Sequence, residues 1–166
     1  IAFQIGMIFR STQAKRGLGT IRQDVNVSIR GGFRCEIKGV QELSLLSKAV
    51  ENEASRQVSL IELRNSLKRR GVKKVGAQPV DVTLLLRDTK SKVLRGMIDG
   101  GVTIFAFKLS GFGGMLKREI SPSTGKTFGR ELAEYVSIFG LKGIIHSDED
   151  LAKYNAVGDF EKLRQH

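Results

Sequence analysis

Two neighbouring stretches of this sequence, residues 22–28 and 34–38, carry polar side chains at every second position. The oxygen-bearing members are Asp24, Asn26 and Glu36, and the basic members are Arg22, Arg34 and Lys38. Carboxylate and amide oxygens suit Mg²⁺, which takes few protein ligands and completes its shell with water and substrate phosphates. Arginine and lysine beside those oxygens would hold phosphate charge. The pattern therefore indicates a site where Mg²⁺ and a phosphorylated ligand could meet.

A solvated sheet face without any ligand would show the same pattern. Opposite charges facing each other across two strands are common on such faces, and they add little to stability. On the alternation alone this simpler interpretation is favoured, so the metal site needs a second line of argument.

The elements that would bring these side chains together are two strands joined by a turn. Apolar residues alternate with the polar ones from Ile21 to Ile29 and again from Phe33 to Ile37, and Gly31-Gly32 separates the two runs. This predicts a β-hairpin with one apolar and one polar face. Opposed residues share a face, so a three-residue loop over 30–32 fits the pattern and a two-residue loop does not. The predicted pairs are Ile29 with Phe33, Val27 with Cys35, Val25 with Ile37, Asn26 with Glu36, and Asp24 with Lys38.

Gly32 is expected to take the left-handed backbone conformation that such a loop needs. Apolar spacing predicts helices before and after the hairpin, over residues 2–15 and from Leu43 to Arg70. A resemblance to a capping box at Ser59 suggests that the second helix restarts there. The basic run 68–70 suits the end of a helix dipole before a glycine cap, and an RNA contact is the alternative explanation.

The second half of the chain shows a different order of elements. Residues 72–79, which have glycine and proline in or beside them, are the best linker candidate. Beyond them we predict strands over 80–86, 102–109 and 143–146, and helices over 90–98, 128–139 and 159–164. A glycine-rich loop covers 110–114. The predicted fold class is α+β: a hairpin with long helices, followed by a compact two-layer α+β domain.

Charge is distributed unevenly along the 166 residues, whose net charge is +11. Residues 1–74 hold 15 Lys and Arg against 6 Asp and Glu, whereas residues 75–166 hold 13 against 11. A basic first half attracts polyanions, nucleic acid above all, although a basic solvated surface needs no ligand. No apolar run is long enough for a membrane span. The single cysteine excludes an internal disulfide and fits a cytoplasmic protein.

Several apparent motifs do not meet their own requirements. Residues 121–127 end like a phosphate-binding loop, but the first glycine is missing, and we predict a turn before a helix. The sequence His146-Ser147-Asp148 is not evidence of a catalytic triad, and a loop or cap is expected there. Two histidines and one cysteine exclude a structural zinc site within the chain.

The two polar stretches also carry a family resemblance. Residues 16–29, with the sequence RGLGTIRQDVNVSI, and residues 34–41, with RCEIKGVQ, closely resemble the E subunit of the archaeal glutamyl-tRNA(Gln) amidotransferases and, more distantly, the bacterial B subunit. Residues 80–83, 108–114, 128–133 and 143–148 are similar to an insertion domain that the E subunit shares with bacterial-type aspartyl-tRNA synthetases. The resemblance thus implies that 1–74 is the C-terminal part of a cradle-shaped catalytic domain and that 75–166 is the insertion domain.

The resemblance implies a ligase that uses ATP and Mg²⁺ to phosphorylate the glutamate of Glu-tRNA(Gln). Ammonia from a partner glutaminase, the D subunit of the amidotransferase, would then displace the phosphate to give Gln-tRNA(Gln), so a hetero-oligomer without membrane contact is expected. Asp24 and Glu36 are the expected metal ligands, Arg22 and Arg34 the expected nucleotide-binding residues, and Asn26 and Lys38 the expected catalytic residues.

Two further expectations follow from this comparison. The chain resembles a piece of a longer protein, so by itself it should be inactive. The alternative function is a tRNA-binding or partner-binding insertion module without catalysis of its own. The weaker charge of the second half favours the enzyme for the parent protein, because a strongly RNA-binding module should itself be basic.

Overall fold

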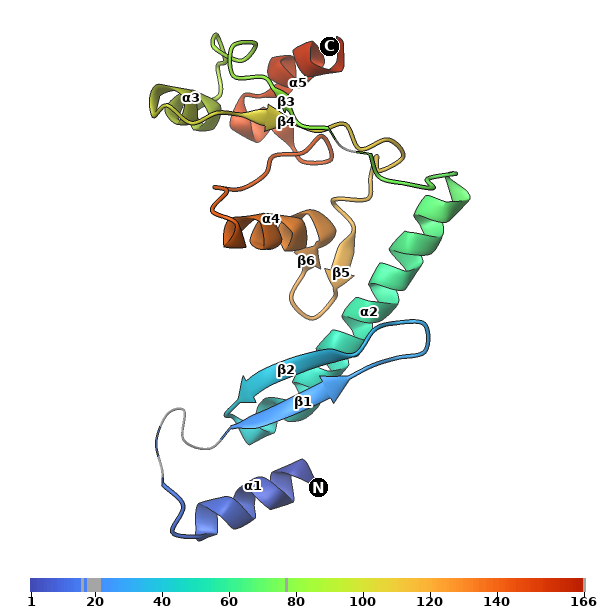
Figure 1. The fold of residues 1–166 in the computed structure, drawn as a ribbon, viewed down its shortest axis with the longest axis vertical. Coiled ribbons are helices and arrows are strands. Elements are labelled where there is room, and N and C mark those ends of the chain that lie inside the picture. The colour runs from blue at the N-terminus through green and yellow to red at the C-terminus, as the bar shows by residue number, and fades with distance from the viewer. Residues whose placement is uncertain (16, 18–21, 77, 166) are drawn as a thin grey trace. The chain divides into compact units, whose positions relative to one another are not determined.

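The computed structural model describes residues 1–15, 17, 22–76 and 78–165 (Figure 1). Its contacts divide the chain into two compact units, 1–65 with 119–127, and 66–118 with 128–166. This division does not fall in the predicted linker 72–79. The assignment of 1–74 and 75–166 to a cradle and an insertion domain stays a prediction. No helix in the described part of the chain is long and apolar enough to cross a membrane.

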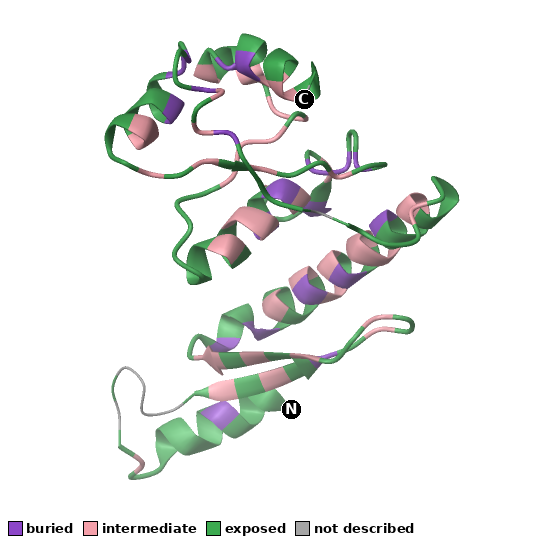
Figure 2. Cartoon of the chain, turned by 45° about the horizontal axis from the view of Figure 1, so that its top comes forward, coloured by how far each residue is buried: buried purple, intermediate pink, exposed green. Residues whose placement is uncertain are grey.

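The first unit begins with a short, unusually apolar helix, α1 (Ala2–Ser11). It ends earlier than predicted, because Thr12 is extended and its amide and hydroxyl both bond to the carbonyl of Phe9. Gly6 is its one buried residue, and a Cβ added there would lie 2.6 Å from Leu43. The helix therefore contacts its neighbour through a glycine, and most of its apolar side chains remain exposed (Figure 2).

A two-stranded antiparallel hairpin, β1 (Gln23–Val27) and β2 (Cys35–Val40), follows. The ladder confirms the predicted pairs of Val25 with Ile37, Asn26 with Glu36, and Val27 with Cys35. The start of the predicted alternation, at Ile21, lies outside the described residues.

The hairpin turn is wider than predicted. The strands end at Val27 and begin again at Cys35, so Ile29 and Phe33 lie outside the ladder, and Phe33 is 85% exposed. The amide of Gly32 donates to the carbonyl of Ile29, 3.0 Å away, and this bond closes the turn before the ladder can reach that pair. Gly31, with φ +83°, takes the left-handed conformation that we predicted for Gly32.

The long helix α2 (Leu46–Arg69) follows a single 3₁₀ turn, η1 (Leu43–Leu45). It runs without a break, so the predicted restart at Ser59 is wrong. The predicted glycine cap is confirmed: Gly71 has φ +74°, and the amides of Gly71 and Val72 bond to the carbonyls of Lys68 and Leu67.

A second, smaller hairpin also belongs to the first unit. It pairs β5 (Glu119–Ser121) with β6 (Lys126–Thr127) around a turn that contains Gly125 with φ +64°. Ile120 is fully buried, and the hydroxyl of Ser123 in the turn donates to Asn52 on α2 at 2.6 Å. Residues 121–127 are thus a turn before a helix, as predicted, and not a phosphate-binding loop.

The second unit combines short strands and helices around one apolar cluster. Its elements are β3 (Val80–Asp81), α3 (Lys92–Asp99), β4 (Phe105–Ala106), α4 (Phe128–Ile138), η2 (Leu151–Tyr154) and α5 (Val157–Gln165). The buried centre consists of Val82, Leu86, Leu94 and Ala156. The α+β class and the three helices of this half are confirmed.

The strands of the second unit are much shorter than the apolar runs that predicted them. After two residues of β3, the carboxylate of Asp81 accepts a hydrogen bond from the amide of Thr83 at 2.9 Å, and the chain turns. Leu85 and Leu86 still reach the apolar cluster, but from the turns that follow. No strand forms over 143–146 in the described structure, where Gly143 has φ +144°.

Candidate functional site

The polar face of the β1–β2 hairpin brings together the side chains that the sequence singled out. Asn26 lies directly opposite Glu36, and both are exposed, whereas Val27 on the other face is only 5% exposed. All six predicted site residues are exposed, namely Arg22, Asp24, Asn26, Arg34, Glu36 and Lys38. Within the ladder the predicted sorting of polar and apolar side chains is therefore correct, whereas Phe33, which was predicted on the apolar face, is exposed.

Asp24 is held in place by a backbone contact that the sequence did not reveal. The register shifts beside it, so Gln23 pairs with Val40 and the predicted Asp24–Lys38 pair is not part of the ladder. The Asp24 Oδ1 atom instead accepts a hydrogen bond from the amide of Gly39, 2.8 Å away. Gly39 has φ +76°, a conformation that glycine adopts without strain. The bulge thus fixes the Asp24 carboxylate across the two strands.

Glu36 and Lys38 form a charge pair on this face. The Lys38 Nζ atom lies 3.4 Å from Glu36 Oε2, and the two side chains are 64% and 46% exposed. An exposed pair of this kind contributes little to stability, so both groups can exchange partners at small cost. Arg22 and Arg34 form no ion pair with any described residue. Among the described residues, Arg22 and Arg34 are therefore without an ion-pair partner, and Glu36 and Lys38 are held only by an exposed, weak pair.

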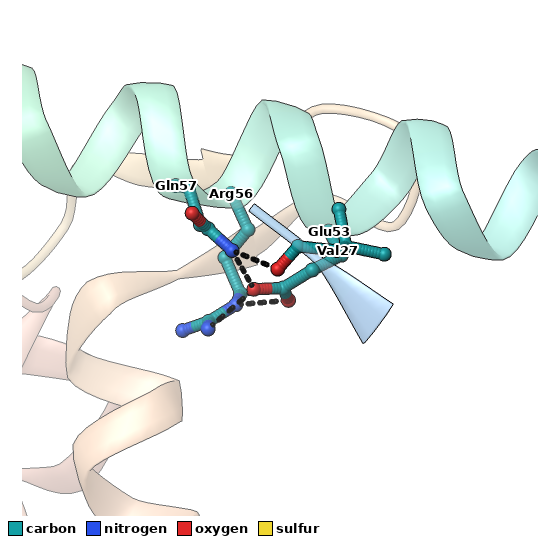
Figure 3. A network of polar contacts seen from close by, with 4 residues as sticks. All are labelled: Val27, Glu53, Arg56 and Gln57. Atoms are coloured by element: carbon teal, nitrogen blue, oxygen red, sulfur yellow. Dashed lines mark hydrogen bonds and ion pairs between the residues drawn. The ribbon is translucent and has the colours of Figure 1, made fainter. Parts of the chain in front are cut away.

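The opposite face of the hairpin rests on a buried polar network from α2 (Figure 3). The Gln57 carboxamide donates to the carbonyl of Val27 at 3.3 Å and to Glu53 Oε1 at 2.8 Å. Arg56 donates to both carboxylate oxygens of Glu53, at 2.8 and 2.9 Å. Glu53 and Gln57 are only 8% and 5% exposed. A charged, hydrogen-bonded cluster thus supports the strand that carries Asn26.

Ionisation in this network follows from its contacts. Burial by itself would raise the pKa of Glu53, but hydrogen bonds from Arg56 and Gln57 and the charge of Arg56 together hold that pKa below its ordinary value. Burial, and then the charge of Glu53 and a hydrogen bond to it, raise the pKa of the Cys35 thiol. Glu53 is therefore a carboxylate at neutral pH, and Cys35 is a protonated thiol next to it.

The network also explains a glycine in the hairpin turn. A Cβ added to Gly32 would lie 2.3 Å from Gln57 Oε1 and 3.0 Å from Ile29. Gln57 Oε1 is buried and accepts no hydrogen bond from any described residue, so its contact with the turn is one of close packing. Glu53 and Gln57 were not predicted, because the apolar spacing of α2 pointed to Val50 and Val58, which are exposed. The signal that the sequence offered was the presence of these two polar residues close to the apolar positions of the helix.

The donor chemistry of the polar face fits Mg²⁺ in a site shared with phosphates. No group of three or more His, Cys, Asp or Glu side chains is placed to hold a metal within the described residues. Asp24, Asn26 and Glu36 offer two carboxylates and one amide, and Mg²⁺ is commonly held by one or two carboxylates with water and substrate oxygens. The assignments of Asp24 and Glu36 to a metal, Arg22 and Arg34 to a nucleotide, and Asn26 and Lys38 to catalysis stay predictions.

The His146-Ser147-Asp148 sequence lies in a loop and makes structural contacts, as predicted. The Asp148 carboxylate accepts hydrogen bonds from the amides of Gly114 and Leu116, at 2.8 and 2.9 Å. His146 Nε2 lies 3.2 Å from Glu149. These contacts tie loops together and form no triad.

Comparison with known proteins identifies the family of this chain. The model of the GatB/GatE catalytic domain matches residues 2–131. The chain therefore belongs to the GatB/GatE catalytic domain family. Its curated relatives are named as the E subunit of glutamyl-tRNA(Gln) amidotransferase. The protein from Pyrobaculum arsenaticum is 48% identical over 161 residues, which cover 96% of this chain and 26% of the relative.

Two further relatives bear the same name and a similar degree of identity. The Archaeoglobus fulgidus protein is 51% identical over 150 residues, 90% of this chain and 23% of the relative. The Methanospirillum hungatei protein is 50% identical over 159 residues, 95% of this chain and 25% of the relative. The chain thus spans about a quarter of the length of these relatives.

Proposed function

We propose that this chain is part of a tRNA-dependent amidotransferase that converts Glu-tRNA(Gln) into Gln-tRNA(Gln). The names of the curated relatives support the class of enzyme. The observation that carries the proposal is the exposed pair of Asn26 and Glu36, opposite each other on the hairpin, with Asp24 anchored beside them. ATP would phosphorylate the glutamate side chain, and ammonia would then displace the phosphate.

Four residues of the polar face would bind the metal and the nucleotide. Asp24 and Glu36 would hold Mg²⁺, which supplies charge neutralisation at the phosphates of ATP. Arg22 and Arg34, which have no ion-pair partner among the described residues, would bind phosphate oxygens. Phosphoryl transfer depends chiefly on positioning and charge, so an enzyme of this class needs these groups more than it needs an acid or base.

Asn26 and Lys38 would act at the transferred phosphoryl group. Asn26 lies opposite Glu36 and two residues after Asp24 on the same strand, and its amide can donate to a phosphate oxygen. Among the described residues, Lys38 has one ion-pair partner, Glu36, and this exposed contact is weak. With Glu36 holding the metal, Lys38 would lose that partner, and its ammonium group could pair with the negative charge of the phosphoryl group.

The rest of the assembly follows from the class of enzyme. A glutaminase-type D subunit would supply ammonia, so the protein would work as a cytoplasmic hetero-oligomer. Residues 1–166 alone should be inactive, because they span about a quarter of the length of the relatives.

The proposal is tested by assaying the intact protein with Glu-tRNA(Gln), ATP and Mg²⁺. We expect ADP release that depends on Glu-tRNA(Gln), and Gln-tRNA(Gln) once ammonia is added. Asp24→Asn should suppress both, because the amide keeps the shape and loses the charge. Asp88→Asn, at a 77% exposed side chain of the second unit, is the matched control and should leave both unchanged. ADP release that is independent of Glu-tRNA(Gln) would contradict the proposal.

A further inference from the structure

Two basic segments of the second unit, 66–74 and 108–118, lie together because their hydrogen bonds join them. The guanidinium group of Arg70 donates to the carbonyls of Gly111 and Gly113, at 2.8 and 2.7 Å. Arg69 and Arg118 both donate to the hydroxyl of Ser66, at 3.1 and 3.3 Å. The end of α2 and the glycine-rich loop therefore form one continuous surface, which we call the basic platform.

The basic platform concentrates positive charge from two segments that are distant in the sequence. Residues 66–74 contain five Lys and Arg, residues 108–118 contain three, and neither segment contains Asp or Glu. Five exposed lysines form no ion pair with any described residue, namely Lys68, Lys73, Lys74, Lys108 and Lys117. Uncompensated cations repel each other, so this arrangement costs folding stability.

The backbone of the basic platform is fixed before any ligand arrives. Gly111 has φ +83°, and a Cβ added there would lie 2.4 Å from Val72, so the loop packs closely on the segment that follows α2. Asp148, the acid bonded to this loop, uses both carboxylate oxygens to accept from the amides of Gly114 and Leu116. A rigid platform loses less entropy on binding than a mobile one.

The helix dipole explains only part of this charge. Cations in the last turn of α2 suit the negative end of the helix, which accounts for Lys68 and Arg69. Arg70 is used by the glycine-rich loop, so it is a structural residue and not a free RNA contact. Lys73, Lys74, Lys108 and Lys117 lie outside any helix, and the dipole gives no reason for them.

We infer that the basic platform binds the phosphate backbone of RNA, with Lys68, Lys73, Lys74, Lys108 and Lys117 as the contacting residues. Lysine binds phosphate as a point charge, so this surface would not distinguish one base sequence from another. The inference rests on the proposed function, in which tRNA is the substrate. The platform would bind that RNA on the second unit, whereas the hairpin residues would bind Mg²⁺ and ATP.

The test uses the intact protein and unmodified tRNA(Gln) transcript, with binding measured by filter retention from low to high salt. The triple variant Lys68→Gln, Lys73→Gln, Lys74→Gln should bind about tenfold more weakly, and its slope of log affinity against log salt should fall by about 2. The matched control is Lys92→Gln, Lys142→Gln, Lys162→Gln. These are three exposed lysines of the same unit, outside the platform and without ion pairs among described residues, and this control should change neither quantity. The corresponding Lys→Arg triple variant at 68, 73 and 74 should bind as the parent does.

Three other outcomes would overturn the inference, and each would point to a different explanation. Equal losses in the platform and control variants would mean that only net charge matters. Unchanged tRNA affinity with lost assembly on size-exclusion chromatography would assign the surface to an acidic partner protein. Unchanged affinity in the platform variant, with Glu-tRNA(Gln)-dependent ADP release intact, would reject the platform and leave the proposed function standing.

Discussion

The side chain of Gln57 on α2 holds the backbone of Val27 on β1, with its Nε2 atom 3.3 Å from the carbonyl oxygen. Val27 follows Asn26, and its ladder partner Cys35 precedes Glu36. The buried face of the hairpin is thus fixed one residue away from the two polar side chains that face solvent. Stability of the network and geometry of the candidate site are linked through this one strand.

Replacing Gln57 with leucine should destabilise the protein by about 1–3 kcal/mol. Leucine has a similar volume, but it removes the Gln57 donor to the carbonyl of Val27 and one of the two donors to Glu53 Oε1, which keeps its bond from Arg56. Urea unfolding measures the loss. Gln13→Leu, at an exposed position, should change the free energy of unfolding by no more than about 0.5 kcal/mol. Equal effects at both positions would show that the network contributes nothing.

Glu53 should make the stability of the protein depend on pH in the acidic range. Its pKa is depressed in the folded state, so the stabilisation is fully present above the unfolded pKa, about 4.3, and is lost as pH falls through the lower folded pKa. Glu53→Gln should remove this part of the pH dependence and should destabilise the protein at pH 7, where Arg56 loses a charged partner. Urea unfolding between pH 3 and 7 compares the two proteins, and parallel curves would contradict the account.

Gly32→Ala should destabilise the protein by about 1–3 kcal/mol, because the new methyl group would meet Gln57 Oε1. Gln57 cannot move aside without losing its two hydrogen bonds. Gly76→Ala is the control, since a Cβ there meets nothing within 4 Å. The double variant Gly32→Ala, Gln57→Ala should lose less than the sum of its single changes. Additive losses would indicate that the two residues do not interact.

Sequence periodicity predicted the candidate face well because β-structure has a strict two-residue repeat. It placed Asn26 opposite Glu36, and all six candidate site residues are exposed. It could not predict the bulge at Asp24, which depends on the left-handed backbone of Gly39. It also missed the support from α2, because Glu53 and Gln57 are polar residues that become buried only through specific partners.

In the second half of the chain, sequence periodicity predicted the helices correctly but not the strands. Helices α3, α4 and α5 were placed correctly, because their apolar spacing persists for two turns or more. The strands are shorter than predicted where a single contact ends them, as the hydrogen bond from the Thr83 amide to Asp81 does after β3. The small hairpin of β5 and β6 was not predicted, because strands of three and two residues leave no measurable alternation.

The most direct measurement is ATP-dependent turnover of the intact protein after Glu36→Gln. Glu36 is exposed and bonded only to Lys38 among the described residues, so the variant should fold normally, as thermal unfolding can verify. The account predicts that phosphorylation and amidation of Glu-tRNA(Gln) fall to background, because an amide cannot supply the charge of a carboxylate to Mg²⁺. Binding of tRNA should persist, and Glu51→Gln, an exposed acid of α2, should behave as the parent protein. Full turnover in the Glu36→Gln protein would contradict the account and make the polar face an ordinary solvated surface.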